Sequence, residues 1–149
     1  MASEPLEVRD AELVLAQNAH FYRAIERMDL RSMSECWTCT DSDVCIHPGW
    51  QVITGWTEIL DTWAAIFQGA AFMKFEITEA QVHLHGDLAR VHCVENIYTL
   101  ASGLQSHSVA AATNLFVRHG GRWLLTLHHA SPSSTRIIRP RRSSRIPGS

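Results

Sequence analysis

The sequence has little lysine and tyrosine and no long apolar run. Lys74 is its single lysine, and it has two tyrosines. No apolar stretch approaches the ~20 residues that cross a bilayer. The first seven residues also lack the basic and apolar runs that open a secretory signal. We therefore expect a cytoplasmic protein that does not bind a membrane.

Several recurrent cofactor motifs are also missing. The chain has no glycine-rich phosphate loop and no nucleophile elbow, and Cys36-x-x-Cys39 has no second cysteine pair to complete a zinc site. His83-x-His85 with His92 resembles a metal site, but Arg90 pairs with His83 in the expected hairpin and its charge opposes a divalent ion. We expect no cofactor, no metal and reduced cysteines.

Charge is unevenly distributed. Residues 136–149 contain five arginines and no acid, whereas the other 135 residues hold 8 basic and 15 acidic groups. A net-acidic body argues against a nucleic-acid partner, because affinity for nucleic acids comes largely from phosphate neutralisation. The arginine-, serine- and proline-rich end predicts a disordered basic tail over 134–149.

What is present indicates one globular domain. The chain has 149 residues, 46% of them hydrophobic and 19% charged, which is enough to bury a core without staples. Apolar residues recur with helical spacing from Arg9 to Met28 and over 56–67. Asp29 is a predicted N-cap for a short helix from Leu30 to Trp37.

Strand patterns dominate the second half. Short strands are predicted around Val44–Ile46 and Gln51–Thr54. Gly86-Asp87 and Gly120-Gly121 are typical of two-residue hairpin turns, which need positive φ angles. The four long strands predicted around these turns span 72–85, 88–100, 106–119 and 122–131.

The order of elements, together with several short motifs, resembles the SnoaL-like and ketosteroid-isomerase-like members of the nuclear-transport-factor-2-like superfamily. The motifs are His47-Pro48-Gly49-Trp50, Gly55-Trp56, Gly86-Asp87, Gly121-Arg122-Trp123 and His128-His129-Ala130-Ser131. The resemblance covers roughly residues 9–133. It implies an α+β cone, with three N-terminal helices packed on a curved antiparallel sheet, as a domain over 1–133.

Strand register predicts which residues share the inner face of that sheet. If both glycine turns contain two residues, Asn114 faces Leu127 and Ala112 faces His129. Glu95, Asn114 and His129 are then the main polar groups on an apolar face. A carboxylate such as Glu95 needs a partner there, or a raised pKa.

The resemblance also implies roles for particular residues. Asn114 lies where ketosteroid isomerases carry a protonated acid, and His47 lies where they carry a proton-shuttling aspartate. Phe21 replaces their oxyanion-binding tyrosine, and we expect Tyr22 on a different helix face. The predicted catalytic residues are His47, Glu95, Asn114 and His129, with Asn114 polarising a carbonyl through its amide. The predicted ligand-binding residues are Phe21, Trp50, Trp63, Phe67 and Phe116.

Two functions stay open at this point. One is a cofactor-free isomerase, cyclase or dehydratase that transfers protons on a small apolar or aromatic molecule. The other is a non-catalytic dimerisation or ligand-sensing module like the kinase hub domains, although Asn114 and Ala130 replace two arginines of the hub pocket. The apolar outer sheet face, which includes Val109, Ala111 and Leu115, predicts a homodimer.

Overall fold

The computed structural model describes residues 6–133, so the predicted tail over 134–149 lies outside the described residues. Two helices come first, two short strands and a third helix follow, and four long strands complete the described chain. The helices are α1 (Leu6–Glu26), α2 (Leu30–Cys36) and α3 (Trp56–Gln68). The strands are β1 (Val44–Ile46), β2 (Ile53–Thr54), β3 (Phe72–His85), β4 (Leu88–Ala101), β5 (Leu104–His119) and β6 (Arg122–Pro132). The α+β prediction is confirmed.

The helix ends follow from local chemistry. Asp29 caps α2 by accepting a hydrogen bond from the backbone N–H of Arg31, as the sequence predicted. Gly55 precedes α3 at a φ of 94°, a conformation that glycine adopts without strain. The α1 helix begins three residues before the predicted Arg9 and ends two before Met28, a small difference typical of helix termini.

The six strands form one sheet in the order β2-β1-β6-β5-β4-β3. Only the β1–β6 pair is parallel among the described strands. Both predicted glycine turns connect their strands as expected. Ser102 and Gly103, at φ angles of 52° and 75°, make the third tight turn between β4 and β5.

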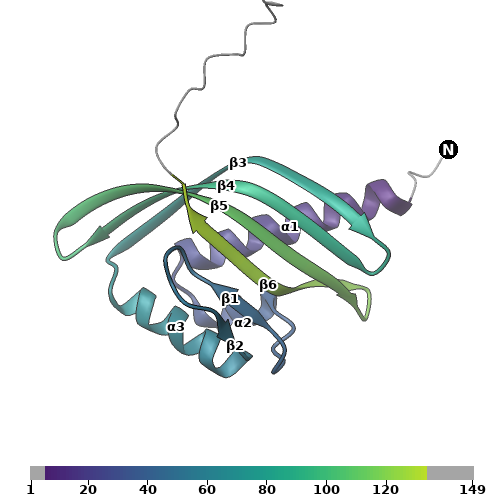
Figure 1. Cartoon of the computed structure of the whole chain (residues 1–149), viewed down its shortest axis with the longest axis horizontal. Coiled ribbons are helices and arrows are strands. Elements are labelled where there is room, and N and C mark those ends of the chain that lie inside the picture. Colours follow the sequence, from purple (N-terminus) through teal and green to yellow (C-terminus); the bar gives the residue numbers. More distant parts are fainter. Residues whose placement is uncertain (1–5, 134–149) are drawn as a thin grey trace, which may run out of the picture.

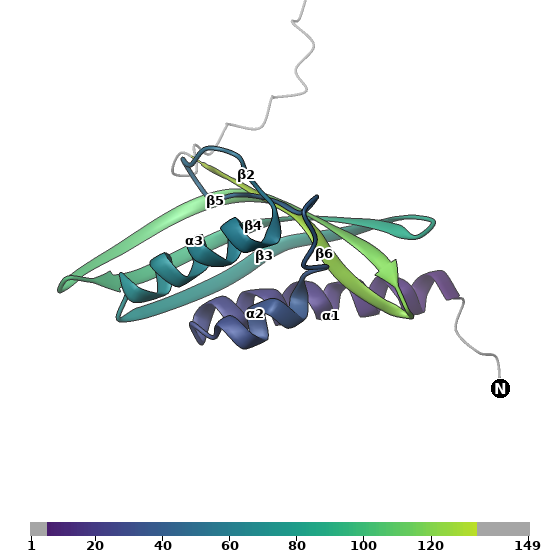
Figure 2. The same cartoon turned by 90° about the horizontal axis from the view of Figure 1, so that it is seen from below.

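The helices and the sheet form two layers with the core between them. All three helices lie against one face of the curved sheet, and α1 runs along β3 (Figures 1 and 2). The core joins Val14, Phe21 and Ile25 of α1 to inner-face residues of the long strands such as Val91 and Phe116. Within residues 6–133, no helix has the length and apolarity needed to cross a membrane.

Candidate functional site

Glu95 and Asn114 lie on the inner face of the sheet, where register analysis placed them. They come from β4 and β5 and are 1% and 0% exposed. The predicted pairing around the first glycine turn is also correct, with Val82 opposite Val91 and Leu84 opposite Ala89. Two polar side chains are therefore buried on the inner face of the sheet.

His129 does not join them, so its predicted position is wrong. The β5–β6 register shifts between Leu115 and Phe116, because Thr126 forms a bulge in β6. Beyond this bulge Asn114 pairs with His128 and Ala112 with Ala130, one residue away from the expected partners. A shift of one residue exchanges the two faces of a strand. His128 is therefore buried inside the fold and His129 is exposed.

Tyr22 is also buried in the interior, on a side of α1 that faces the strands while Phe21 faces Trp37 and Trp63. The phenolic oxygen of Tyr22 donates a hydrogen bond to Oε2 of Glu95 at 2.6 Å. Phe21 beside it is fully buried and contacts the rings of Trp37 and Trp63. Because α1 packs against strands on one side and against other helices on another, two adjacent residues can both face the core.

A continuous hydrogen-bond network joins α1 to the sheet. Asn114 donates through Nδ2 to Oδ1 of Asn18 at 2.8 Å and to the Tyr22 oxygen at 3.2 Å. Its other amide atom, Oδ1, lies 2.6 Å from Nδ1 of His128 and accepts that proton. Both amide N–H groups of Asn114 are thus occupied. This geometry does not support the predicted role of Asn114 as a donor to a substrate carbonyl.

The network fixes one tautomer of His128. Since Nδ1 carries the proton donated to Asn114, the lone pair of Nε2 is free, and Nε2 lies 3.9 Å from Oε2 of Glu95. Burial, with a smaller contribution from the nearby histidines His47 and His129, lowers the pKa of His128 to about 3. The ring is therefore neutral near pH 7 and presents an acceptor to Glu95.

Glu95 is balanced between two protonation states. Burial raises its pKa from 4.5 to about 7, although the hydrogen bond from Tyr22 acts in the opposite direction. Burial also raises the pKa of Tyr22 well above its ordinary value, with the charge of Glu95 adding to this effect. Tyr22 consequently stays protonated and Glu95 can either hold or release a proton near neutral pH. The hydrogen bond from Tyr22 reaches the Glu95 carboxyl through Oε2.

His47 lies at the end of β1, where a tight turn begins. Pro48 and Gly49 occupy the turn, Gly49 has a φ of 81°, and the N–H of Trp50 bonds to the carbonyl of His47 at 2.9 Å. The His47 ring is buried, and Nε2 lies 2.9 Å from Oγ1 of Thr62 on α3. Burial lowers the pKa of His47 to about 4, so the ring is neutral at pH 7.

Aromatic rings connect His47 to His128. Trp63 meets the His47 ring edge-on at 4.6 Å and lies 6.3 Å from the His128 ring. Its indole Nε1 is buried without a hydrogen-bond partner within the described residues. A buried unpaired donor is costly. Trp63 therefore offers a hydrogen bond that an acceptor atom can use.

The other predicted ligand-binding residues occupy different depths. Phe116 is fully buried in the core, and Phe67 stacks at a tilt on Trp63 at 5.8 Å. Trp50 is 48% exposed but meets the His47 ring at 4.8 Å. The structure thus brings Trp63, Phe67 and Trp50 around His47, while Phe21 and Phe116 support the network from within the core.

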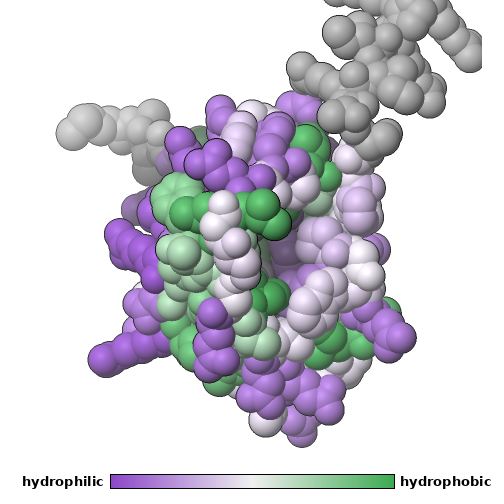
Figure 3. Space-filling model, turned by 90° about the vertical axis from the view of Figure 1, so that its left-hand side faces the viewer, coloured by the Kyte–Doolittle hydropathy of each residue, from purple (hydrophilic) through white to green (hydrophobic). Residues whose placement is uncertain are grey.

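The surface of the molecule has at least two hollows. Figure 3 shows a recess bordered along one side by hydrophobic residues, on the face that lies at the left of Figure 1. A second hollow, a groove of about 380 Å³, runs between α1 and β3. Tyr22 and Asn18 form part of its wall, together with apolar side chains such as Phe75 and Ile77. The buried network therefore reaches a ligand-sized groove at its α1 end.

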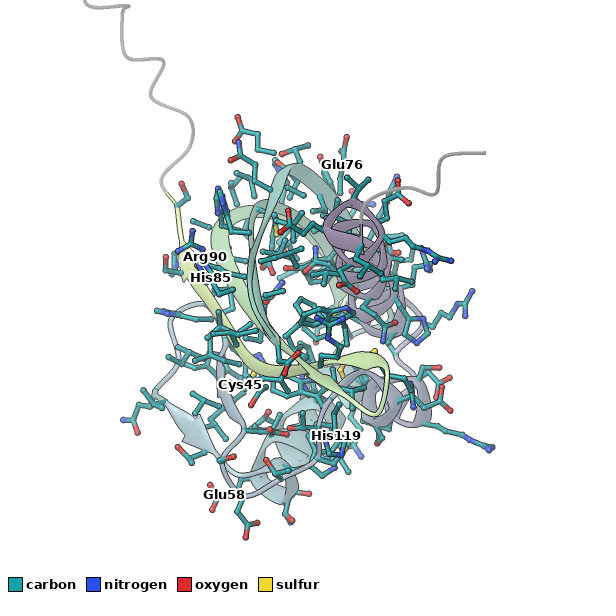
Figure 4. The ribbon with its side chains drawn as sticks, turned by 90° about the vertical axis from the view of Figure 1, so that its right-hand side faces the viewer. Cys45, Glu58, Glu76, His85, Arg90 and His119 are labelled. Carbon is teal, nitrogen blue, oxygen red and sulfur yellow. The ribbon has the colours of Figure 1, made fainter. Side chains whose placement is uncertain are left out.

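No fixed positive charge reaches the interior of the described chain. Every arginine, and Lys74, is exposed among residues 6–133. Figure 4 shows Arg90 and His85 on the side of the sheet away from α1. His83 and His92 stack at 5.7 Å on this outer side, and no group of three or more potential ligands over residues 6–133 could hold a metal ion. The buried titratable groups inside the fold thus include two carboxyls, Glu95 and Asp43, and two neutral imidazoles, His47 and His128. Hydrogen bonds from Thr38, Thr40 and Thr126 occupy Asp43.

Comparison with known proteins defines the family. The model of the SnoaL-like domain matches residues 14–135. The chain belongs to the SnoaL-like family. A solved structure from Streptomyces avermitilis, a candidate dehydratase of the NTF2-like family, is 34% identical to this SnoaL-like domain with a TM-score of 0.81. The match covers 87% of this chain and 99% of that one.

Two further relatives of this SnoaL-like domain are a kinase association domain and an F-box protein. A candidate calcium/calmodulin-dependent protein kinase type II association domain from Thiobacillus denitrificans is 27% identical, with a TM-score of 0.70, over 79% of this chain and 93% of that one. The F-box protein SKIP8 of Arabidopsis thaliana is 25% identical over 79% of this chain. The SnoaL-like domain spans about half of that protein, 48% of its length.

Proposed function

We propose that this SnoaL-like domain is a lyase of the dehydratase type, which removes water from a small hydroxy-carbonyl compound by acid–base catalysis. The contact between Glu95 and His128, buried and held by Tyr22 and Asn114, carries the proposal. A carboxyl group that changes protonation state near neutral pH is the group a general acid requires. The 34% identity to a candidate dehydratase supports the same reaction class.

His47, Glu95 and Trp63 each have a defined role in this reaction. His47 removes a proton from the carbon next to the substrate carbonyl, and the electron pair of that C–H bond forms a carbon–carbon double bond. The C–O bond to the hydroxyl group breaks, and Glu95 donates its carboxyl proton to the departing oxygen, which leaves as water. The indole N–H of Trp63 binds the carbonyl oxygen, on which negative charge develops. Transfer of a proton from His47 back to Glu95 by way of water restores both groups.

The interior selects an uncharged substrate. Glu95 is an acid, and every arginine among residues 6–133 is exposed. The described interior therefore has no arginine to neutralise the charge of a carboxylate or phosphate. An unpaired charge moved into an apolar interior is strongly unfavourable. Aromatic rings around His47 favour a flat, apolar body.

A panel of ligands tests this proposal. We expect neutral β-hydroxy ketones and lactones to raise the melting temperature by roughly 5 °C at a hundredfold excess over Kd, and to yield the unsaturated product with loss of one water. Matched compounds carrying a carboxylate should give smaller shifts. Stronger binding of the charged members would contradict the selection of an uncharged substrate.

The alternative is a ligand-sensing or assembly module, which the 27% identity to a kinase association domain favours. If the domain is such a module, a compound of the same panel should raise the melting temperature without being converted into a product. Mass spectrometry of the incubated mixture separates the two functions. Product formation that Glu95→Gln abolishes supports the lyase.

The protein is further proposed to act as a homodimer through the outer sheet face. Ala111 is exposed there between half-buried Val94 and Thr113. We expect light scattering to give a mass near twice 16.7 kDa. Ala111→Arg should yield the monomer, because it places an unpaired charge in the interface, whereas Glu12→Arg on exposed α1 should not. A parent protein that is monomeric at all concentrations contradicts the dimer.

A further inference from the structure

Thr62 lies on α3 facing His47, and its hydroxyl group has only one proton to give. That proton is donated to the carbonyl oxygen of Ile59, three residues earlier in the same helix, at 2.7 Å. The Thr62 oxygen can therefore act only as an acceptor toward Nε2 of His47, 2.9 Å away. It follows that Nε2 of His47 carries the ring proton.

The other ring nitrogen is left without a fixed partner. The sulfur of Cys45 lies 3.9 Å from Nδ1 and 3.7 Å from Nε2, so this thiol contacts the ring rather than bonding to one nitrogen. Among residues 6–133 no other hydrogen bond reaches Nδ1. Its lone pair is free to accept a proton.

His128 has the opposite arrangement. There Nδ1 donates to Asn114 and Nε2 is free beside Glu95. The two buried imidazoles are therefore held in different tautomers by different elements, His47 by α3 and His128 by β5. Each ring presents a different nitrogen as its acceptor.

We propose that Thr62 is a positioning residue, which holds His47 in the Nε2–H tautomer and makes Nδ1 the nitrogen that accepts the substrate proton. This inference rests on the proposed function for the identity of the reaction, but the tautomer itself is a property of the resting protein. The Thr62 oxygen also stabilises the ring after Nδ1 is protonated, because it then accepts a hydrogen bond from a charged donor.

Nitrogen-15 NMR of the imidazole rings tests the tautomer without any substrate. In the parent at pH 7 we expect the His47 signals, assigned by their loss in His47→Gln, to show a protonated Nε2 and an unprotonated Nδ1. His128 should show the reverse. Thr62→Val keeps the shape but removes the acceptor, so His47 should become a mixture of tautomers. Thr62→Ser should restore the parent pattern.

Turnover provides the second measurement. We expect Thr62→Val to lower kcat roughly tenfold to a hundredfold, since a hydrogen bond to a charged group is lost, while Thr62→Ser stays close to the parent. The acidic limb of the pH profile should move to lower pH in Thr62→Val, because the imidazolium loses its acceptor. Thr57→Val, an exposed change on the same helix, should alter neither measurement.

Two results would overturn the inference. One is a parent His47 with its proton on Nδ1. The other is a folded Thr62→Val variant whose tautomer is unchanged. Failure of the proposed function gives a different result. The NMR spectra would then show the expected tautomers, but the protein would dehydrate no member of the panel.

Discussion

Replacement of Glu95 by glutamine is expected to lower kcat/KM for a panel substrate by about 10²–10⁴-fold, the range typical of a lost general acid. The amide can still accept the hydrogen bond from Tyr22 but has no carboxyl proton to donate. Stability should stay equal or rise, because the variant no longer buries a carboxyl group at 1% exposure. A gain on the order of 1–3 kcal/mol is expected above pH 7, where the parent carboxyl is charged.

The measurement is paired, with turnover and thermal unfolding recorded for each variant. Glu76→Gln is the matched control, since Glu76 is an exposed carboxylate on neighbouring β3 (Figure 4). It should change neither quantity. A Glu95→Gln protein that keeps full turnover would remove Glu95 from the reaction, and one that is strongly destabilised would show that the carboxyl group serves the fold.

Much of the fold could be predicted from glycine positions and periodicity. Gly86-Asp87 and Gly120-Gly121 fix two hairpins, because few other residues tolerate their backbone angles. Once these turns are placed, alternation along β4 and β5 assigns Glu95 and Asn114 to one face. That part of the candidate site therefore followed from local rules.

The position of His128 could not be found in this way. The bulge at Thr126 involves no glycine or proline, so no local signal marks it. Beyond the bulge, β6 pairs with β1 as well as β5, and Leu127 faces Val44 across the parallel ladder. The shift thus depends on pairing between segments about 80 residues apart, and it decides which of two adjacent histidines enters the core.

Tyr22 and Thr62 were missed for a related reason. A helical wheel assigns one face to each residue, but α1 contacts β3 on one side and α2 on another, which buries both Phe21 and Tyr22. Thr62 lies among the apolar residues of α3 without any motif to single it out. Only its distance to His47 in the folded chain points to the role proposed for it.

The buried histidines should make the protein less stable in acid. A histidine with a lowered folded-state pKa contributes stability that is fully present above its unfolded value near 6.5, and that is lost as pH falls toward the folded value. His47 and His128 have folded values of about 4 and about 3. Glu95 acts in the opposite direction. Its pKa is raised to about 7, so its contribution is full below pH 4.5 and is lost as pH rises through 7.

Between pH 6.5 and 4.5 two histidines thus oppose one carboxyl group, and we expect a net loss of roughly 1.4 kcal/mol per pH unit as an upper value. Urea unfolding at intervals of half a pH unit measures this slope. His47→Gln should flatten it, since glutamine can still donate to Thr62 but does not titrate, whereas Glu95→Gln should steepen it. His83→Asn, a change at an exposed histidine, should leave the slope unchanged. Because the two site variants are expected to change the slope in opposite directions, general destabilisation cannot reproduce the pattern. Parallel slopes in parent, His47→Gln and Glu95→Gln would mean that these groups titrate alike in the folded and unfolded chain, which contradicts the effect expected from the burial of each.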